Sequence, residues 1–214
     1  MTSKTKKSKT KLSFLIALAL VAGMSGYGET GRVWASDNPA ASSPRMDSRR
    51  SELPVAAEKN PPGDIPDSQV FVPYSSSQAG YRLSVPEGWA RTTSEHAVTF
   101  QDKLNGLSVT ITKADKLPDK RDIYNNQATR LKQTGRAVIM KQIKTVRLSN
   151  QPAILMRYES NSEPDPVINK QVRLENSSYF YYHNGKLAEL RLWAPLGADN
   201  VDQWRLISRS FNWR

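Results

Sequence analysis

Residues Tyr179 to Ala194 read YFYYHNGKLAELRLWA, and they decide the class of fold. Five aromatic or histidine side chains precede the dipeptide Asn184-Gly185, and alternating apolar residues follow it from Leu187 onward. Asn-Gly is the preferred pair for the two-residue type I′ turn that joins two antiparallel strands. Alternation of apolar and polar residues is typical of a strand with one buried face. This stretch therefore predicts a β-hairpin in an antiparallel sheet.

Similar patterns extend outward on both sides of this hairpin. A second hairpin is expected around residues 103–106, and a long strand is expected to bulge near Asn176-Ser177-Ser178. The segments that alternate or are rich in β-branched and aromatic residues cover 81–85, 97–102, 107–113, 138–148, 153–158, 167–182 and 187–194.

Two amphipathic helices interrupt the strands. The first is expected to begin at an Asp119 cap and to end at Gly135 as the residue after the helix, with one apolar face made by Tyr124, Ala128 and Leu131. The second is expected after a cap at Asp199 or Asn200. Its apolar face is expected to hold Val201, Trp204, Ile207 and Phe211. Strands and helices in this order predict an α+β fold, an antiparallel β-sheet with helices packed on it.

The phrase Gly80-Tyr81-Arg82-Leu83-Ser84-Val85-Pro86-Glu87-Gly88-Trp89 resembles the entry to the PsbP-like superfamily. The strand at 98–102 and the C-terminal stretch from Ala194 to Phe211 are similar to later parts of that superfamily, in its secreted bacterial branch. Relatives include photosystem II extrinsic subunits and a Ran-GTPase-binding protein. The resemblance implies an α/β/α sandwich over about two-thirds of the chain and a non-enzymatic binding or accessory domain. It names no partner.

The N-terminus has the pattern of an export signal. Five lysines and no acidic residue precede the apolar run Phe14–Met24, which is shorter than the roughly 20 residues that span a bilayer. Residues 1–35 are therefore expected to be a signal peptide cleaved after Ala35. Cleavage after Gly28 and an uncleaved membrane anchor are the alternatives. Either way, we expect an extracytoplasmic chain: secreted, periplasmic or on the cell surface.

A Pro/Ser-rich stretch follows the predicted signal. Residues 36–67 contain six prolines and no aromatic residue, so they are expected to be a disordered linker. Residues 68–214 are then the PsbP-like domain. They are long enough to enclose a single core.

Basic residues concentrate in Lys113–Arg147, which holds ten basic and three acidic residues. If the helix and the next strand present them on one face, that face would attract an acidic protein, an anionic membrane or a wall polymer. An ordinary solvated surface is the alternative. We expect no nucleic-acid partner, because only Tyr124 interleaves with the charges and the chain is expected to be exported. The residues expected to bind a partner are Lys120, Arg121, Arg130, Lys132, Arg136, Lys141, Lys144 and Arg147.

Residues suited to catalysis are sparse. The chain has no cysteine and only His96 and His183, and no spacing suggests a metal site or a phosphate loop. Glu163 and Asp165 flank Pro164 in a predicted loop, which is weak evidence for an acid pair. We therefore expect no enzyme activity, no cofactor and no metal. A secreted hydrolase with a dispersed site remains the alternative, and a cleft with convergent carboxylates would favour it.

Overall fold

The hairpin at Asn184-Gly185 forms as predicted in the computed structural model, which describes residues 52–214. Asn184 and Gly185 both have positive φ values, 44° and 78°, as a type I′ turn requires. They join β8 (Arg173–His183) to β9 (Lys186–Pro195), the two central strands of the large sheet.

The seven strands of the large sheet are all antiparallel, in the order β3-β4-β5-β9-β8-β7-β6. A small antiparallel sheet has the order β1-β2-β10. The remaining strands are β1 (Phe71–Ser76), β2 (Tyr81–Pro86), β3 (Ala90–Thr93), β4 (Ala97–Asp102), β5 (Asn105–Lys113), β6 (Ile139–Leu148), β7 (Gln151–Asn161) and β10 (Asn212–Trp213). The predicted second hairpin is confirmed, since β4 and β5 are joined at Lys103-Leu104.

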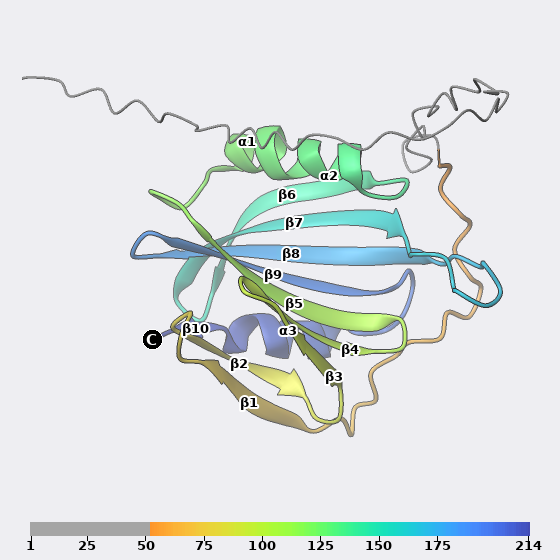
Figure 1. The fold of residues 1–214 in the computed structure, drawn as a ribbon, viewed down its shortest axis with the longest axis horizontal. Coiled ribbons are helices and arrows are strands. Elements are labelled where there is room, and N and C mark those ends of the chain that lie inside the picture. The colour runs from red at the N-terminus through yellow and green to blue at the C-terminus, as the bar shows by residue number, and fades with distance from the viewer. Residues whose placement is uncertain (1–51) are drawn as a thin grey trace, which may run out of the picture. The chain divides into compact units, whose positions relative to one another are not determined.

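The helices lie on opposite faces of the large sheet, as Figure 1 shows. One face carries a single helical segment made of α1 (Lys120–Ile123), a π-helical turn (Tyr124–Ala128) and α2 (Thr129–Thr134). The other face carries α3 (Val201–Ser210) and the small sheet. We call these the α2 face and the α3 face. This layered arrangement confirms the predicted α+β fold with helices packed on an antiparallel sheet.

Alternation along the central strands gives each face its own core. On β7, Leu155 belongs to the core beneath α3, whereas Ile154 and Met156 belong to the core beneath α2. An aromatic stack joins the layers of the α3 face. The rings of Tyr181 and Phe211 lie 4.5 Å apart and nearly parallel, and the Tyr181 hydroxyl donates a 2.7 Å hydrogen bond to the carbonyl of Ser208. The end of α3 is thereby fixed to the C-terminal part of β8.

The first helix begins where the sequence predicts, but the residues that face the core differ from those predicted. Asp119 caps it, with its carboxylate accepting from the backbone N–H groups of Arg121 and Asp122. The π-helical turn then moves the next buried position five residues on, from Ile123 to Ala128. Tyr124, predicted to face the core, is therefore exposed.

Three smaller expectations were wrong. Gly135 ends the helix with φ −86°, not in the left-handed conformation expected of a residue after a helix. Val201, placed on the apolar face of the last helix, is exposed. The bulge predicted near Asn176 lies instead on β6 at Lys141, because β8 pairs in unbroken register with both of its neighbours.

Residues 52–67 differ from the disordered linker that their composition predicts. Ile65 is only 4% exposed, and its N–H donates to Asn200 Oδ1 at 2.6 Å. The N–H of Val55 donates to Asn161 Oδ1, and Glu58 pairs with Lys170. Contacts more than a hundred residues away along the chain hold this segment, which local composition does not encode. The predicted signal peptide and residues 36–51 lie outside the described residues.

Candidate functional site

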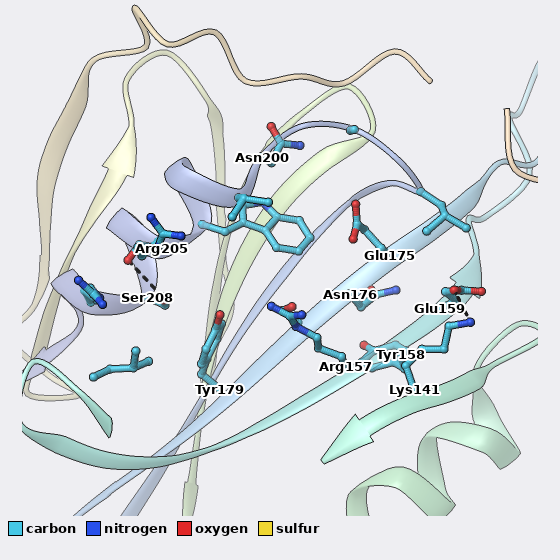
Figure 2. Close-up of a pocket in the computed structure, with 17 residues that line it drawn as sticks. Lys141, Arg157, Tyr158, Glu159, Glu175, Asn176, Tyr179, Asn200, Arg205 and Ser208 are labelled. Carbon is cyan, nitrogen blue, oxygen red and sulfur yellow. Dashed lines mark hydrogen bonds and ion pairs between the residues drawn. The ribbon is translucent and has the colours of Figure 1, made fainter. Parts of the chain in front are cut away.

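A groove opens on the α3 face between α3 and the strands β7 and β8. Its volume is about 420 Å³. Figure 2 shows Arg157, Glu175 and Tyr179 standing on the sheet, with Asn200, Arg205 and Ser208 on the side of α3. Charged and aromatic side chains thus meet in one concave surface, which we call the α3 groove.

The sheet register determines which side chains form its floor. Glu159 of β7 lies directly opposite Glu175 of β8, and Leu155 lies opposite Tyr179. Every second residue of a strand points to the same face. Arg157 therefore shares the groove floor with Glu159, Glu175 and Tyr179.

An ion-pair network occupies one end of the floor. Glu159 accepts from Lys141 Nζ at 2.7 Å and from Arg173 Nε at 3.4 Å. The Arg173 side chain is 2% exposed and also donates to the carbonyl of Ala137 and to Asn161 Oδ1. A buried guanidinium needs such partners, because leaving a buried charge unpaired is strongly destabilising. Glu159 is therefore committed to holding β6, β7 and β8 together at this end.

Glu175 differs from Glu159 in its surroundings. Burial raises the pKa of its carboxyl, the Glu159 carboxylate raises it further, and the Gly197 backbone N–H and Arg157 oppose the rise. A positive group entering the groove would therefore favour the ionised form of Glu175. Glu159 is thus held in ion pairs, whereas the ionisation of Glu175 depends on the charges of the groups beside it.

Helix α3 forms one wall of the α3 groove and contributes an aromatic side chain and positive charge to it. Trp204 is half-buried against the core, and Arg205 and Arg209 are spaced i, i+4, so they project from one side of α3. Arg205 also pairs with Asp202 at 2.8 Å. Four basic side chains line the α3 groove against two glutamates, which makes the groove positive overall: Lys141, Arg157, Arg205 and Arg209.

The basic residues predicted to bind a partner do not share one face. The helical segment places four of them, exposed, on the α2 side: Lys120, Arg121, Arg130 and Lys132. Arg147 also points to the α2 side, because side chains alternate along β6 and it belongs to the set that faces the core beneath α2. Within residues 52–214, none of these five pairs with a carboxylate.

The other three predicted residues lie elsewhere. Lys144 points to the α3 face, since its ladder partner is Leu155. Lys141 lines the α3 groove and is paired with Glu159. Arg136 binds Glu52 at 3.3 Å and Glu163 at 3.7 Å, so it anchors the segment before the first strand. A role in partner binding remains a prediction for all eight residues.

Most of the α3 groove was not predictable from the sequence. Arg157, Glu175, Arg205 and Arg209 come from three elements, and only the sheet register and the packing of α3 bring them together. Two local signals point to part of it: the alternation of Arg157 with Glu159 on one strand, and the i, i+4 spacing of the two arginines on the last helix.

The histidines form no centre of their own. His96 lies 3.5 Å from Glu95, and both side chains are largely exposed. Among residues 52–214, no group of three or more His, Cys, Asp or Glu side chains is arranged to hold a metal ion.

Residues 52–214 have the PsbP-like fold. The solution structure of cyanobacterial PsbP (CyanoP) from Synechocystis sp. PCC 6803 superposes with a TM-score of 0.51 and 18% sequence identity, over 72% of this chain and 100% of that chain. The Ran-binding protein Mog1p from Saccharomyces cerevisiae matches with a TM-score of 0.45 and 11% identity, over 68% of this chain and 96% of that one. No protein-family model and no curated protein matches the chain.

Proposed function

We propose that this protein is an exported, non-enzymatic accessory domain that binds another component of the cell envelope through the α3 groove. The observation that carries the proposal is the meeting of Trp204 and Tyr179 with four basic side chains in one concave surface. Tryptophan, tyrosine and arginine are the residues that contribute most to protein interfaces.

The charge of the groove indicates the partner's chemistry. Arg157 and Arg209 are exposed, and no carboxylate among residues 52–214 forms an ion pair with either of them. Acidic side chains of a partner would pair with them and displace water from the aromatic surface. Complementary charge also speeds the encounter and selects the partner. An acidic surface of an envelope protein is therefore the proposed contact.

Export is proposed from the N-terminal sequence alone. Within residues 52–214, no helix is long and apolar enough to cross a membrane. We expect the mature chain to begin at Ser36 when its N-terminal residue is determined by mass spectrometry. A chain that begins at Met1 or Thr2 and fractionates with the membrane would favour the uncleaved anchor, whereas an unprocessed chain found in the cytosol would contradict export.

A binder of anionic membranes or wall polymer is the alternative that the α2 side favours. Lys120, Arg121, Arg130 and Lys132 are exposed along one helical segment and have no carboxylate partner among residues 52–214. Binding to vesicles rich in anionic lipid, lost at high salt and lost in R130E/K132E, would support this alternative.

A hydrolase is the other alternative, and the facing pair Glu159 and Glu175 is the observation in its favour. A raised pKa suits a general acid, and a nearby ionised carboxylate suits a base or nucleophile. Hydrolysis of chromogenic glycosides or esters that disappears in Glu175→Gln would establish it. We expect no turnover, because the pairs with Lys141 and Arg173 already engage Glu159.

Capture of a partner from envelope extract tests the proposal. The groove variant R157E/R209E and the α2-side variant R130E/K132E change the net charge by the same amount on opposite faces of the sheet. We expect the wild-type full chain and the α2-side variant to capture one protein that the groove variant loses. Equal capture by all three chains, or loss only in the α2-side variant, would contradict binding through the groove.

A further inference from the structure

A second cavity lies on the α3 face, beyond the α3 groove. It lies open to solvent between the small sheet on one side and β4 and β5 of the large sheet on the other, and its volume is about 640 Å³. None of the residues that line the α3 groove takes part in it. We call it the inter-sheet cavity.

Apolar atoms make up most of its wall surface, although polar and charged residues also line it. Val98, Val109 and Ile111 form the floor on β4 and β5, and the rings of Tyr74 and Tyr81 face them from the small sheet. The two rings lie 6.3 Å apart. Concave, largely apolar sites of this size with a few polar groups are the usual form of small-molecule sites.

Tyr81 is the unusual member of this wall. It is 3% exposed, and its hydroxyl has no hydrogen-bond partner among the described residues. Although the ring is buried, the hydroxyl oxygen keeps some contact with solvent, so water or a ligand can accept from it. Burial raises the pKa of Tyr81 well above its ordinary value, so the hydroxyl remains a protonated donor. The cavity wall thus contains a hydrogen-bond donor that has no acceptor among residues 52–214.

Two lysines stand at the mouth of the cavity. Lys113 and Lys186 are directly opposite each other in the β5–β9 ladder, and both line the cavity. Like charges directly opposite in a sheet destabilise it, and an anion between them would relieve that repulsion. Lys186 Nζ donates to the carbonyl of Ala79 at 3.0 Å, close to where the chain enters β2 at Tyr81.

The other titratable groups of the cavity wall are Glu95 and His96, whose side chains lie 3.5 Å apart and are largely exposed. Glu95 would repel an anion close to it, so the negative group of a ligand is expected beside the two lysines.

We propose that the inter-sheet cavity binds a small amphipathic carboxylate. Its apolar body would lie against Val98, Val109 and Ile111, and its carboxylate would accept from the Tyr81 hydroxyl and pair with Lys113 and Lys186. This site is separate from the α3 groove and does not depend on the proposed partner.

Calorimetric titration of the purified full chain with sodium octanoate tests the proposal, with 1-octanol and sodium acetate as comparison probes. Octanoate should bind about fivefold more tightly than octanol, the upper end of what one exposed charge pair gives, and acetate should not bind measurably. Equal binding of octanol and octanoate would show an apolar cleft without carboxylate recognition and would overturn the proposal. Absence of octanoate binding would overturn it too.

Three variants locate the site. Tyr81→Phe keeps the ring and removes the hydroxyl, and K113A/K186A removes both charges. Each should weaken octanoate binding at least about fivefold, and octanol binding should fall less than octanoate binding in both. Lys144→Ala, on a distant strand of the same face, is the matched control and should bind octanoate like the wild type. If Tyr81→Phe and K113A/K186A also bind like the wild type, the cavity is not the site.

Discussion

At the scale of single residues, Gly106 shows how close packing requires a particular side chain. A Cβ atom at Gly106 would overlap the ring of Trp193, its ladder partner on β9. The indole therefore lies across the β5 backbone, where only glycine leaves room for it. We predict that Gly106→Ala lowers the free energy of unfolding by about 1–3 kcal/mol, the usual cost of overpacking, as measured by urea denaturation.

A double-mutant cycle separates this clash from a general effect on the strand. In a Trp193→Ala background, Gly106→Ala should cost much less, because the ring that it would strike is gone. An equal cost in both backgrounds would show that the ring is not the reason for the glycine.

The carboxyl of Glu175 predicts a dependence of stability on pH. Its folded-state pKa is raised above the ordinary 4.5, mainly by burial. The protonated form is thus favoured by folding, and this stabilisation is fully present below the ordinary pKa and is lost as pH rises through the folded value. Glu175→Gln should therefore gain stability relative to the wild type between pH about 4 and pH about 7 in urea denaturation. A difference that stays constant with pH would contradict the raised pKa.

At the scale of elements, α3 and the segment that precedes the first strand hold each other. Asn200 accepts from the N–H of Ile65 at 2.6 Å and donates to the carbonyl of Gly63 at 2.9 Å. Asn200→Ala should cost about 1–3 kcal/mol, because it leaves the buried N–H unpaired. Hydrogen exchange of the Ile65 amide should accelerate.

Asp199→Ala is the matched control for that change. Asp199 is the adjacent residue and is exposed, and its hydrogen bond to Asp64 uses the backbone N–H, which the substitution keeps. This variant should leave the Ile65 exchange rate unchanged. Equal acceleration in both variants would mean that the start of α3, not the Asn200 side chain, holds the segment.

Helices and turns were predictable where the residues that determine them lie within a few positions in the sequence. Asn184-Gly185 sets its turn, and Asp119 caps its helix, because each acts on residues within a few positions of itself. The exposure of Tyr124 was not predictable. The prediction rests on the regular α-helical period, and the π-helical turn interrupts that period and rotates Tyr124 away from the core. Residues 52–67 have the composition of a linker. They are ordered by two asparagines and one arginine distant in the sequence, Asn161, Asn200 and Arg136.

At the scale of the whole molecule, the sequence predicts the antiparallel sheet and its helices but not the candidate site. The α3 groove combines β6, β7, β8 and α3, and its charges come together only when the strand order is known. The predicted basic segment is continuous in sequence, yet a strand next to a helix alternates its side chains between two faces. Lys144 and Arg147 accordingly point to opposite sides of the sheet.

Site-specific photo-cross-linking in intact cells tests the central claim most directly. A photoreactive amino acid replaces Val201, which is 63% exposed at the α3 groove, or Tyr124, which is 51% exposed on the α2 side. Neither change alters the charge of the protein. Binding through the α3 groove predicts a cross-link from position 201 to one envelope protein and none from position 124. A cross-link from position 124 alone, or from neither position, would contradict it.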